Sequence, residues 1–160
     1  MKKIFATFLA FILLISLVSC STPKYSDSKN AFKLYKAVSS SVVTENGIKV
    51  LDSDAILEIS NESISYIRDF VMVRANNAKN VNEYGIFRVE DGKANDLKAI
   101  VEEYVQRKKT SYLAMNYLPE ETQKIENAST RIFGNYVVYS FLNEADTESL
   151  DSAIKSNISK

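Results

Sequence analysis

Residues 128–142, ASTRIFGNYVVYSFL, carry the clearest fold signal in this chain of 160 residues. The apolar and β-branched runs Ala128–Phe133 and Tyr136–Leu142 flank the dipeptide Gly134-Asn135. Runs of this composition favour strands, and a two-residue connection that contains glycine is typical of a β-hairpin. We therefore predict an antiparallel strand pair here.

A second strand pair is predicted upstream of this hairpin. Phe70–Ala75 is rich in β-branched residues, with Val71 and Val73 on one face, and Tyr84–Val89 is a similar run. Between them, residues 76–82 contain four asparagines, which are common in loops. Neighbouring strands with a short polar connection most simply pair antiparallel.

The strongest helical pattern lies between the two strand pairs. It starts at Asn95 or Asp96 and runs to about Met115, with apolar residues three and four positions apart. Pro119 ends this helix, because proline disfavours helical geometry in the residue before it. Proline also suits the first turn of a helix, so a further short helix through Ile125 is expected.

Shorter helices are predicted towards both ends of the chain. Asn30 can cap a helix over Ala31–Val43, and Thr147 can cap the last helix. Short helical segments are expected after Ser53 and over Asn61–Ile67. This order of elements predicts an α+β fold, a two-layer sandwich in which an antiparallel sheet of about four strands packs helices on one face.

The N-terminus has the pattern of a bacterial lipoprotein signal. Met1-Lys2-Lys3 precedes the apolar run Ile4–Val18, which is shorter than the roughly 20 residues that a membrane-spanning helix needs. The predicted cleavage motif is Leu17, Val18, Ser19 and Cys20. We expect cleavage after Ser19 and attachment of a diacylglycerol to the Cys20 thiol. The alternative, an uncleaved anchor with an ordinary thiol, is disfavoured by the specific residue order before Cys20.

This motif divides the chain into three expected parts. They are a lipoprotein signal peptide over residues 1–19, a flexible lipidated tether over 20–30, and a single globular domain over 31–160. Two acyl chains hold a protein stably at a bilayer. We therefore expect a protein anchored by membrane lipid at Cys20 to the extracytoplasmic face of the cell membrane.

Lysines outnumber acidic residues at the start of the expected mature chain. Lys24, Lys29, Lys33 and Lys36 accompany a single acidic residue, Asp27. Such a segment could contact anionic lipid head groups or wall polymers. A solvated tether that runs into a helix face is the favoured interpretation.

The composition excludes several kinds of chemistry. The chain has no histidine, and its single cysteine is expected to be consumed by lipid. Serine–histidine–aspartate triads, the usual zinc sites and disulfides are therefore not expected. Removal of Lys2 and Lys3 with the signal leaves 18 of the 20 basic residues against 20 acidic ones. This balance argues against nucleic acid as a partner, and we expect no cofactor.

Three segments that contain acidic residues are candidate sites. Asp52, Asp54, Glu58 and Glu62 could supply oxygens to calcium, but their spacing does not fit an EF-hand. The turn 91–96 lacks the glycine pattern of a phosphate-binding loop. Glu120 and Glu121 are adjacent on a predicted helix and so do not face each other. Helix-end charge and an ordinary turn are the favoured interpretations.

Tyrosines offer a further alternative. A face that binds sugars or peptides could be built from aromatic side chains. The candidates are Tyr104, Tyr112, Tyr117, Tyr136 and Tyr139. Their spacing favours core positions instead.

Several of these segments together resemble a known family. They are Ala31–Val38, Phe70–Ala75, Tyr84–Ala94, the long helix with Tyr104, Asn116–Pro119 and Gly134–Val138. Over residues 31–142 the chain resembles bacterial lipoproteins that contain domain of unknown function 4358. Members often have Gly-Asp-Tyr in the hairpin where this chain has Gly134-Asn135-Tyr136. The resemblance implies lipoprotein status and the fold, and it transfers no active site.

Taken together, these features predict a non-enzymatic lipoprotein whose domain binds an envelope protein or a wall polymer. One alternative is an enzyme that acts on envelope glycans or peptides through carboxylate and tyrosine side chains. Another is a solute-capturing lipoprotein, which is less favoured because a single small domain lacks the two lobes of transporter-linked receptors.

Overall fold

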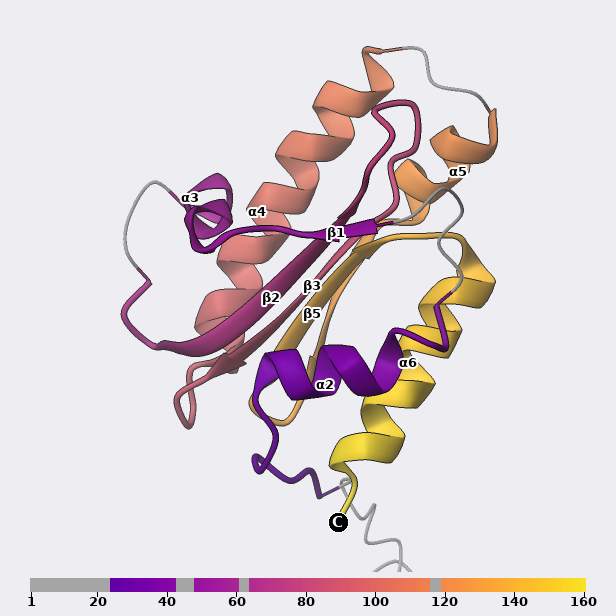
Figure 1. Cartoon of the computed structure of the whole chain (residues 1–160). Helices are drawn as coiled ribbons and strands as arrows, with labels where there is room; N and C mark the ends of the chain where they lie inside the picture. The colour runs from indigo at the N-terminus through magenta and orange to yellow at the C-terminus, as the bar shows by residue number, and fades with distance from the viewer. Residues whose placement is uncertain (1–23, 43–47, 61–63, 116–118) are drawn as a thin grey trace, which may run out of the picture.

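The computed structural model describes residues 24–42, 48–60, 64–115 and 119–160 (Figure 1). The predicted signal peptide and Cys20 lie outside the described residues, as does the predicted turn at Asn46-Gly47. Within the described part, no helix is both long enough and apolar enough to cross a membrane.

An open antiparallel sheet of five strands forms the centre of the domain. The strands are β1 (Ile48–Val50), β2 (Ile67–Ala75), β3 (Glu83–Val89), β4 (Ser129–Phe133) and β5 (Tyr136–Phe141). Their spatial order is β1-β2-β3-β5-β4, and every neighbouring pair is antiparallel. Both predicted strand pairs are confirmed. β1 was not predicted, because three residues carry too little periodicity to indicate a strand.

The helices lie close to where they were predicted, but several begin or end at other residues. They are α2 (Ala31–Val38), a 3-10 turn η1 (Ser53–Ala55), α3 (Ile56–Ile59), α4 (Ala94–Leu113), α5 (Pro119–Asn127) and α6 (Glu144–Ile158). Asn30 caps α2 as expected, but the helix ends at Val38, before a run of three serines that are poor helix formers. α6 is capped by Asn143, not Thr147. Ile67 begins a strand where a helical segment was expected.

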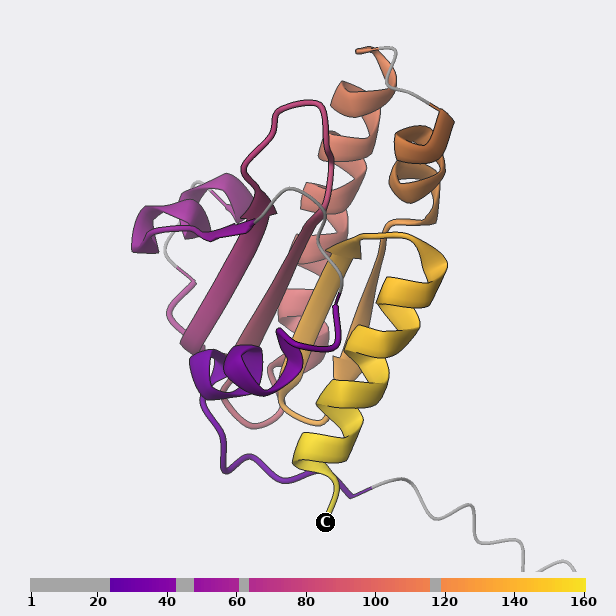
Figure 2. The same ribbon diagram turned by 45° about the vertical axis from the view of Figure 1, so that its right-hand side comes forward.

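Helices cover both faces of the sheet (Figure 2). α2 and α6 pack on one face, in a core that includes Val71, Tyr84 and Val138. α4 and α3 pack on the other face, in a core that includes Phe87 and Tyr139, and α5 lies against α4. The α+β class and the antiparallel sheet are confirmed. The sheet has five strands, where about four were expected. Helices on both faces give three layers, where two were expected.

The reason for the third layer is visible in β5. All six of its residues are buried, and alternate side chains enter the two cores. A strand with one solvated face alternates apolar and polar residues, whereas a strand buried on both faces is apolar throughout. The run Tyr136–Phe141 is of the second kind.

Candidate functional site

The predicted lipid-attachment motif lies outside the described residues, so the structure places none of Leu17, Val18, Ser19 and Cys20. The described domain offers three features that could carry function. They are an apolar groove beside β2, a buried charge cluster around Glu83, and a polar network that holds the segment 24–30 on the domain.

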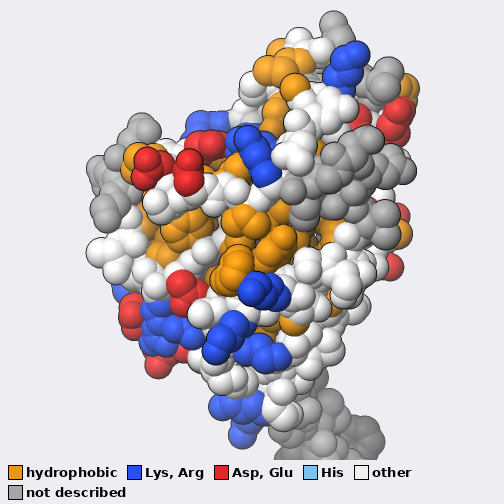
Figure 3. All heavy atoms as spheres, in the orientation of Figure 1, with side chains coloured by type: hydrophobic (Ala, Val, Ile, Leu, Met, Phe, Trp, Pro, Cys, Tyr) orange, Lys and Arg blue, Asp and Glu red, His pale blue; other side chains and the backbone are white. Residues whose placement is uncertain are grey.

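The apolar groove lies between α2, the β1–α3 segment and the first half of β2. It has a volume of about 550 Å³. Its apolar lining is Phe32, Val50, Leu51, Ile56, Leu57, Ile64, Ile67, Phe70 and Val71. Phe32 is 46% exposed, Val50 44% and Leu57 53%. Figure 3 shows apolar side chains gathered in a hollow in the middle of this face, with basic side chains below them.

The groove exists because β1 is much shorter than β2. β1 pairs only with Val73–Ala75, and the chain then turns away into η1 after Leu51 N–H donates to Met72 O at 2.9 Å. Backbone groups of alternate residues face the same strand edge, so those of Phe70 face the edge that Met72 uses. Among the described residues, no strand lies beside Phe70 there. The groove therefore borders an open strand edge.

The rim of the groove is charged. Asp52 stands at one side, exposed, and its side chain makes no capping hydrogen bond and no ion pair to a described residue. Arg68 and Asp69 also line the groove, and the ammonium of Lys36 lies 4.8 Å from the ring centre of Phe32. An apolar floor bordered by charged side chains of both signs suits a ligand that is itself amphipathic.

The second feature is a buried carboxylate, Glu83 on β3. Tyr104 and Tyr139 donate their hydroxyls to one carboxylate oxygen at 2.6 and 2.7 Å. Arg74 Nε and Lys108 Nζ both donate to the other oxygen at 2.5 Å. These groups come from β2, α4 and β5, so only the packed domain brings them together.

The cluster shifts the acidity of its members. Burial opposes ionisation of Glu83, but Lys108 and Arg74 outweigh it and hold the pKa of that carboxyl below its ordinary value. Burial lowers the pKa of Lys108. Burial, together with the Glu83 charge, raises the pKa of Tyr104 and Tyr139. Glu83 is therefore an ionised carboxylate, and each of its two oxygens accepts from two donors.

The alternative of an aromatic binding face is not supported by the described tyrosines. Tyr104, Tyr136 and Tyr139 are buried, and Tyr112 is half-buried with its ring packed edge-on to Phe141. Their rings belong to the two cores, which agrees with the favoured interpretation. Tyr117 lies outside the described residues.

The described members of the first acidic cluster lie around one hollow, beside a basic side chain. Asp52, Asp54 and Glu58 border a second hollow of about 460 Å³, where Arg74 binds Glu58 at 2.6 Å; Glu62 lies outside the described residues. Over the described ranges, no group of three or more acidic, histidine or cysteine residues could hold a metal ion.

The two remaining candidates have structural roles. Gly92 has a φ of 78° in the turn that leads into α4. Glu121 is buried, where it accepts from Val81 N–H at 2.7 Å and pairs with Lys124 at 2.7 Å, whereas Glu120 is exposed.

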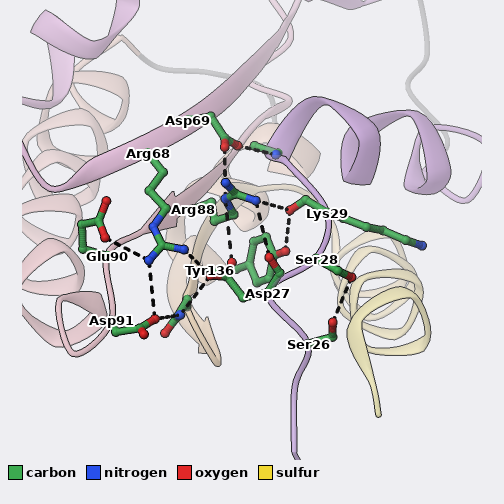
Figure 4. A network of polar contacts seen from close by, with 12 residues as sticks. Ser26, Asp27, Ser28, Lys29, Arg68, Asp69, Arg88, Glu90, Asp91 and Tyr136 are labelled. Atoms are coloured by element: carbon green, nitrogen blue, oxygen red, sulfur yellow. Dashed lines mark hydrogen bonds and ion pairs between the residues drawn. The ribbon is translucent and has the colours of Figure 1, made fainter.

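The third feature was not predicted. Residues 24–30, which we call the N-terminal strap, lie against the domain rather than away from it (Figure 4). Asp27 pairs with Arg68, and its other carboxylate oxygen lies 3.7 Å from Arg88 Nε. Tyr136 donates its hydroxyl to Lys29 O at 2.5 Å. The described part of the expected tether is thus folded onto β2, β3 and β5.

The geometry defines a small α+β domain built on a five-stranded antiparallel sheet, with an apolar groove at one open strand edge. The sequence model of the family described as Domain of unknown function (DUF4358) matches residues 63–142, half of the chain. The chain belongs to this family. No curated protein and no solved structure matches it.

The matched region includes some of the features described above and leaves others out. It contains all five residues of the Glu83 cluster and the β2 side of the groove. α2, β1, α3 and α6 lie outside it. The opposite wall of the groove, with Phe32 and Leu57, is therefore built from segments beyond the matched region.

Proposed function

We propose that this chain is a lipid-anchored protein of the bacterial cell envelope, attached through Cys20, whose domain binds an envelope protein and catalyses no reaction. The observation that carries the binding role is the groove beside β2. Three large apolar side chains there, Phe32, Val50 and Leu57, are each close to half exposed on one concave surface. Such clustering on a small domain marks an interaction site.

The partner that fits this groove is an extended protein segment. Phe70 presents backbone groups at the open edge of β2, and an added strand would satisfy them. Alternate side chains of that strand would enter the apolar floor, and a basic side chain would meet Asp52, which has no ion pair to a described residue. The proposed ligand is therefore a strand with alternating apolar residues and at least one lysine or arginine.

An enzymatic role has less support. The carboxylate and tyrosines that could share chemistry are those of the Glu83 cluster, and Glu83 itself is 1% exposed. Its oxygens are already bound by four donors from within the domain. A substrate would have to displace these donors to reach the carboxylate, whereas catalytic groups normally converge in an accessible cleft.

Cross-linking with a matched pair of variants tests the binding role. The full-length chain is cross-linked in its own envelope, and the captured species are compared with those of Leu57→Asp and Leu113→Asp. Both leucines are about half exposed, but only Leu57 lines the groove. We expect Leu57→Asp to reduce capture at least tenfold and Leu113→Asp to leave it unchanged. Equal capture by both variants would exclude the groove as the binding site.

A further inference from the structure

The N-terminal strap ends beside the C-terminal residues of the domain. Lys160 N–H donates to Lys24 O at 3.1 Å, Tyr25 pairs with Ser159 in an isolated β-bridge, and Ser26 N–H donates to Ile158 O at 2.5 Å. Figure 1 and Figure 2 both show the strap and the end of α6 at one end of the molecule. The chain therefore leaves the domain at a defined place.

Only three residues, 21–23, separate Lys24 from Cys20. A chain of this length spans at most about 14 Å even when fully extended. If Cys20 carries lipid, as in the proposed function on which this inference rests, the strap end of the domain is held within about 14 Å of the bilayer surface. Most of the expected tether is unavailable as a spacer, because residues 24–30 are bound to the domain.

Uncompensated positive charge lies at this end. Lys24 and Lys29 are on the strap, Lys33 is on α2 and Lys155 is near the end of α6; we call these four lysines the basic end. Within the described ranges, none of them has a carboxylate at ion-pair distance. Lys29 Nζ instead donates to Asn157 Oδ1 at 2.6 Å, and Lys155 lies 5.4 Å from the ring centre of Phe133.

The acidic groups near the strap are paired. Arg68 binds Asp27 and Glu90, and Arg88 lies 3.1 Å from Asp69 (Figure 4). Arg68 also lies 3.7 Å from Asp91. The two arginines therefore face four carboxylates, a formal charge of −2, whereas the four lysines of the basic end carry +4, so positive charge is in excess at this end. An anionic membrane attracts such lysines within about one Debye length, roughly 10 Å.

We propose that the basic end binds anionic phosphate head groups of the same bilayer that holds Cys20. Head-group binding would hold the domain in one orientation on the bilayer, with the strap end towards the membrane. The groove lies between α2 and β1, above the strap in the view of Figure 1. In this orientation it opens sideways along the membrane surface.

Fluorescence quenching in vesicles tests this orientation. The full-length chain is expressed and processed in a bacterial host and recovered in detergent. It is then reconstituted into vesicles of phosphatidylcholine alone or with phosphatidylglycerol. A bimane label is attached at Ser28→Cys, on the strap, or at Ser111→Cys, towards the far end of α4; both serines are exposed. Lipids with a quencher near the head group report how close each label lies to the surface.

We expect phosphatidylglycerol to increase quenching of the Ser28→Cys label at least twofold and to leave the Ser111→Cys label unquenched. The double variant Lys24→Glu/Lys33→Glu should abolish that increase. Lys49→Glu/Lys79→Glu, which changes net charge equally at two exposed lysines outside the basic end, should preserve it. High salt should also remove the increase.

Three results would overturn the proposal: equal quenching of Ser28→Cys in both lipids, quenching of Ser111→Cys as strong as that of Ser28→Cys, or equal loss in the two double variants. In each of these the protein still stays with the vesicles. A protein that high salt washes from phosphatidylcholine vesicles lacks its lipid anchor, and that result refutes the proposed function first.

Discussion

At the scale of single residues, Glu83 is a buried charge that accepts hydrogen bonds from four donors. Its side chain is fully buried, and its two cationic partners, Arg74 and Lys108, keep only part of their side chains in contact with water. A buried ion pair adds little compared with an apolar replacement, but removal of one partner leaves the others desolvated and uncompensated. Glu83 should therefore be intolerant of neutral replacement.

Glu83→Gln should destabilise the domain by about 3–5 kcal/mol. The amide nitrogen would face donors on whichever side it is placed, since both oxygens of Glu83 accept from two donors each. Urea denaturation measures the change. Glu58→Gln is the matched control, because Glu58 binds the same Arg74 from the surface and should cost at most about 1 kcal/mol.

The same variant should change the response to acid. The folded state lowers the pKa of Glu83 from its ordinary 4.5, so below that value the unfolded chain binds the proton more readily. The contribution of Glu83 is complete above pH 4.5 and is lost as the pH falls through the lower, folded-state pKa. The difference in unfolding free energy between wild type and Glu83→Gln should therefore shrink below pH 4.5. A constant difference down to pH 3 would contradict an ionised Glu83.

At the scale of elements, the β4–β5 hairpin and the strap depend on each other. Gly134 has a φ of 60° at the hairpin turn, and a Cβ atom there would lie 2.8 Å from Tyr25 Cβ on the strap. Tyr25 also packs edge-on against Phe133, with ring centres 6.3 Å apart. The glycine at this turn is thus required by backbone conformation and by the close approach of the strap.

Gly134→Ala should therefore release the strap, whereas Gly92→Ala should not. Both glycines have positive φ, but a Cβ at Gly92 meets no atom within 4 Å. Gly92→Ala should cost about 1 kcal/mol from backbone conformation alone. Gly134→Ala should cost more and should raise hydrogen exchange at Ser26 N–H, which is bound to Ile158 O. Equal exchange at Ser26 in the two variants would show that the strap does not depend on Gly134.

At the scale of the whole molecule, the two proposals place the domain close to the membrane with its groove accessible from the side. Both depend on the lipid at Cys20. Replacement of that residue is the direct test of the anchor, because no other residue of the chain carries a thiol.

Cys20→Ser should abolish incorporation of labelled fatty acid and should either release the protein from membranes or leave it as an uncleaved precursor. Metabolic labelling and membrane fractionation measure both outcomes. Ser21→Ala, the adjacent position outside the predicted motif, is the control and should be processed normally. Normal labelling of Cys20→Ser would show that the lipid is attached elsewhere or that there is none.

Local sequence determined most of the elements. The dipeptide Gly134-Asn135, the asparagine-rich loop after β2, the cap at Asn30 and the start of α5 at Pro119 all depend on a few neighbouring residues, whereas α4 ends at Leu113, before the predicted stop at Pro119. Their physical effects on backbone dihedrals and terminal hydrogen bonds do not need the rest of the chain. These local elements could therefore be predicted from the sequence.

Tertiary structure decided how these elements combine. The Glu83 cluster joins residues from three strands and one helix, and the groove exists because β1 stops short of β2. The polar strap resembled a tether because its partners, Arg68, Arg88 and Tyr136, lie 41 or more positions away in sequence. The sequence alone determined the local elements and the prediction of a cleavage and lipid-attachment motif at Leu17–Cys20. Strand register and packing decided the third layer, the groove and the strap, because these depend on contacts between residues far apart along the chain.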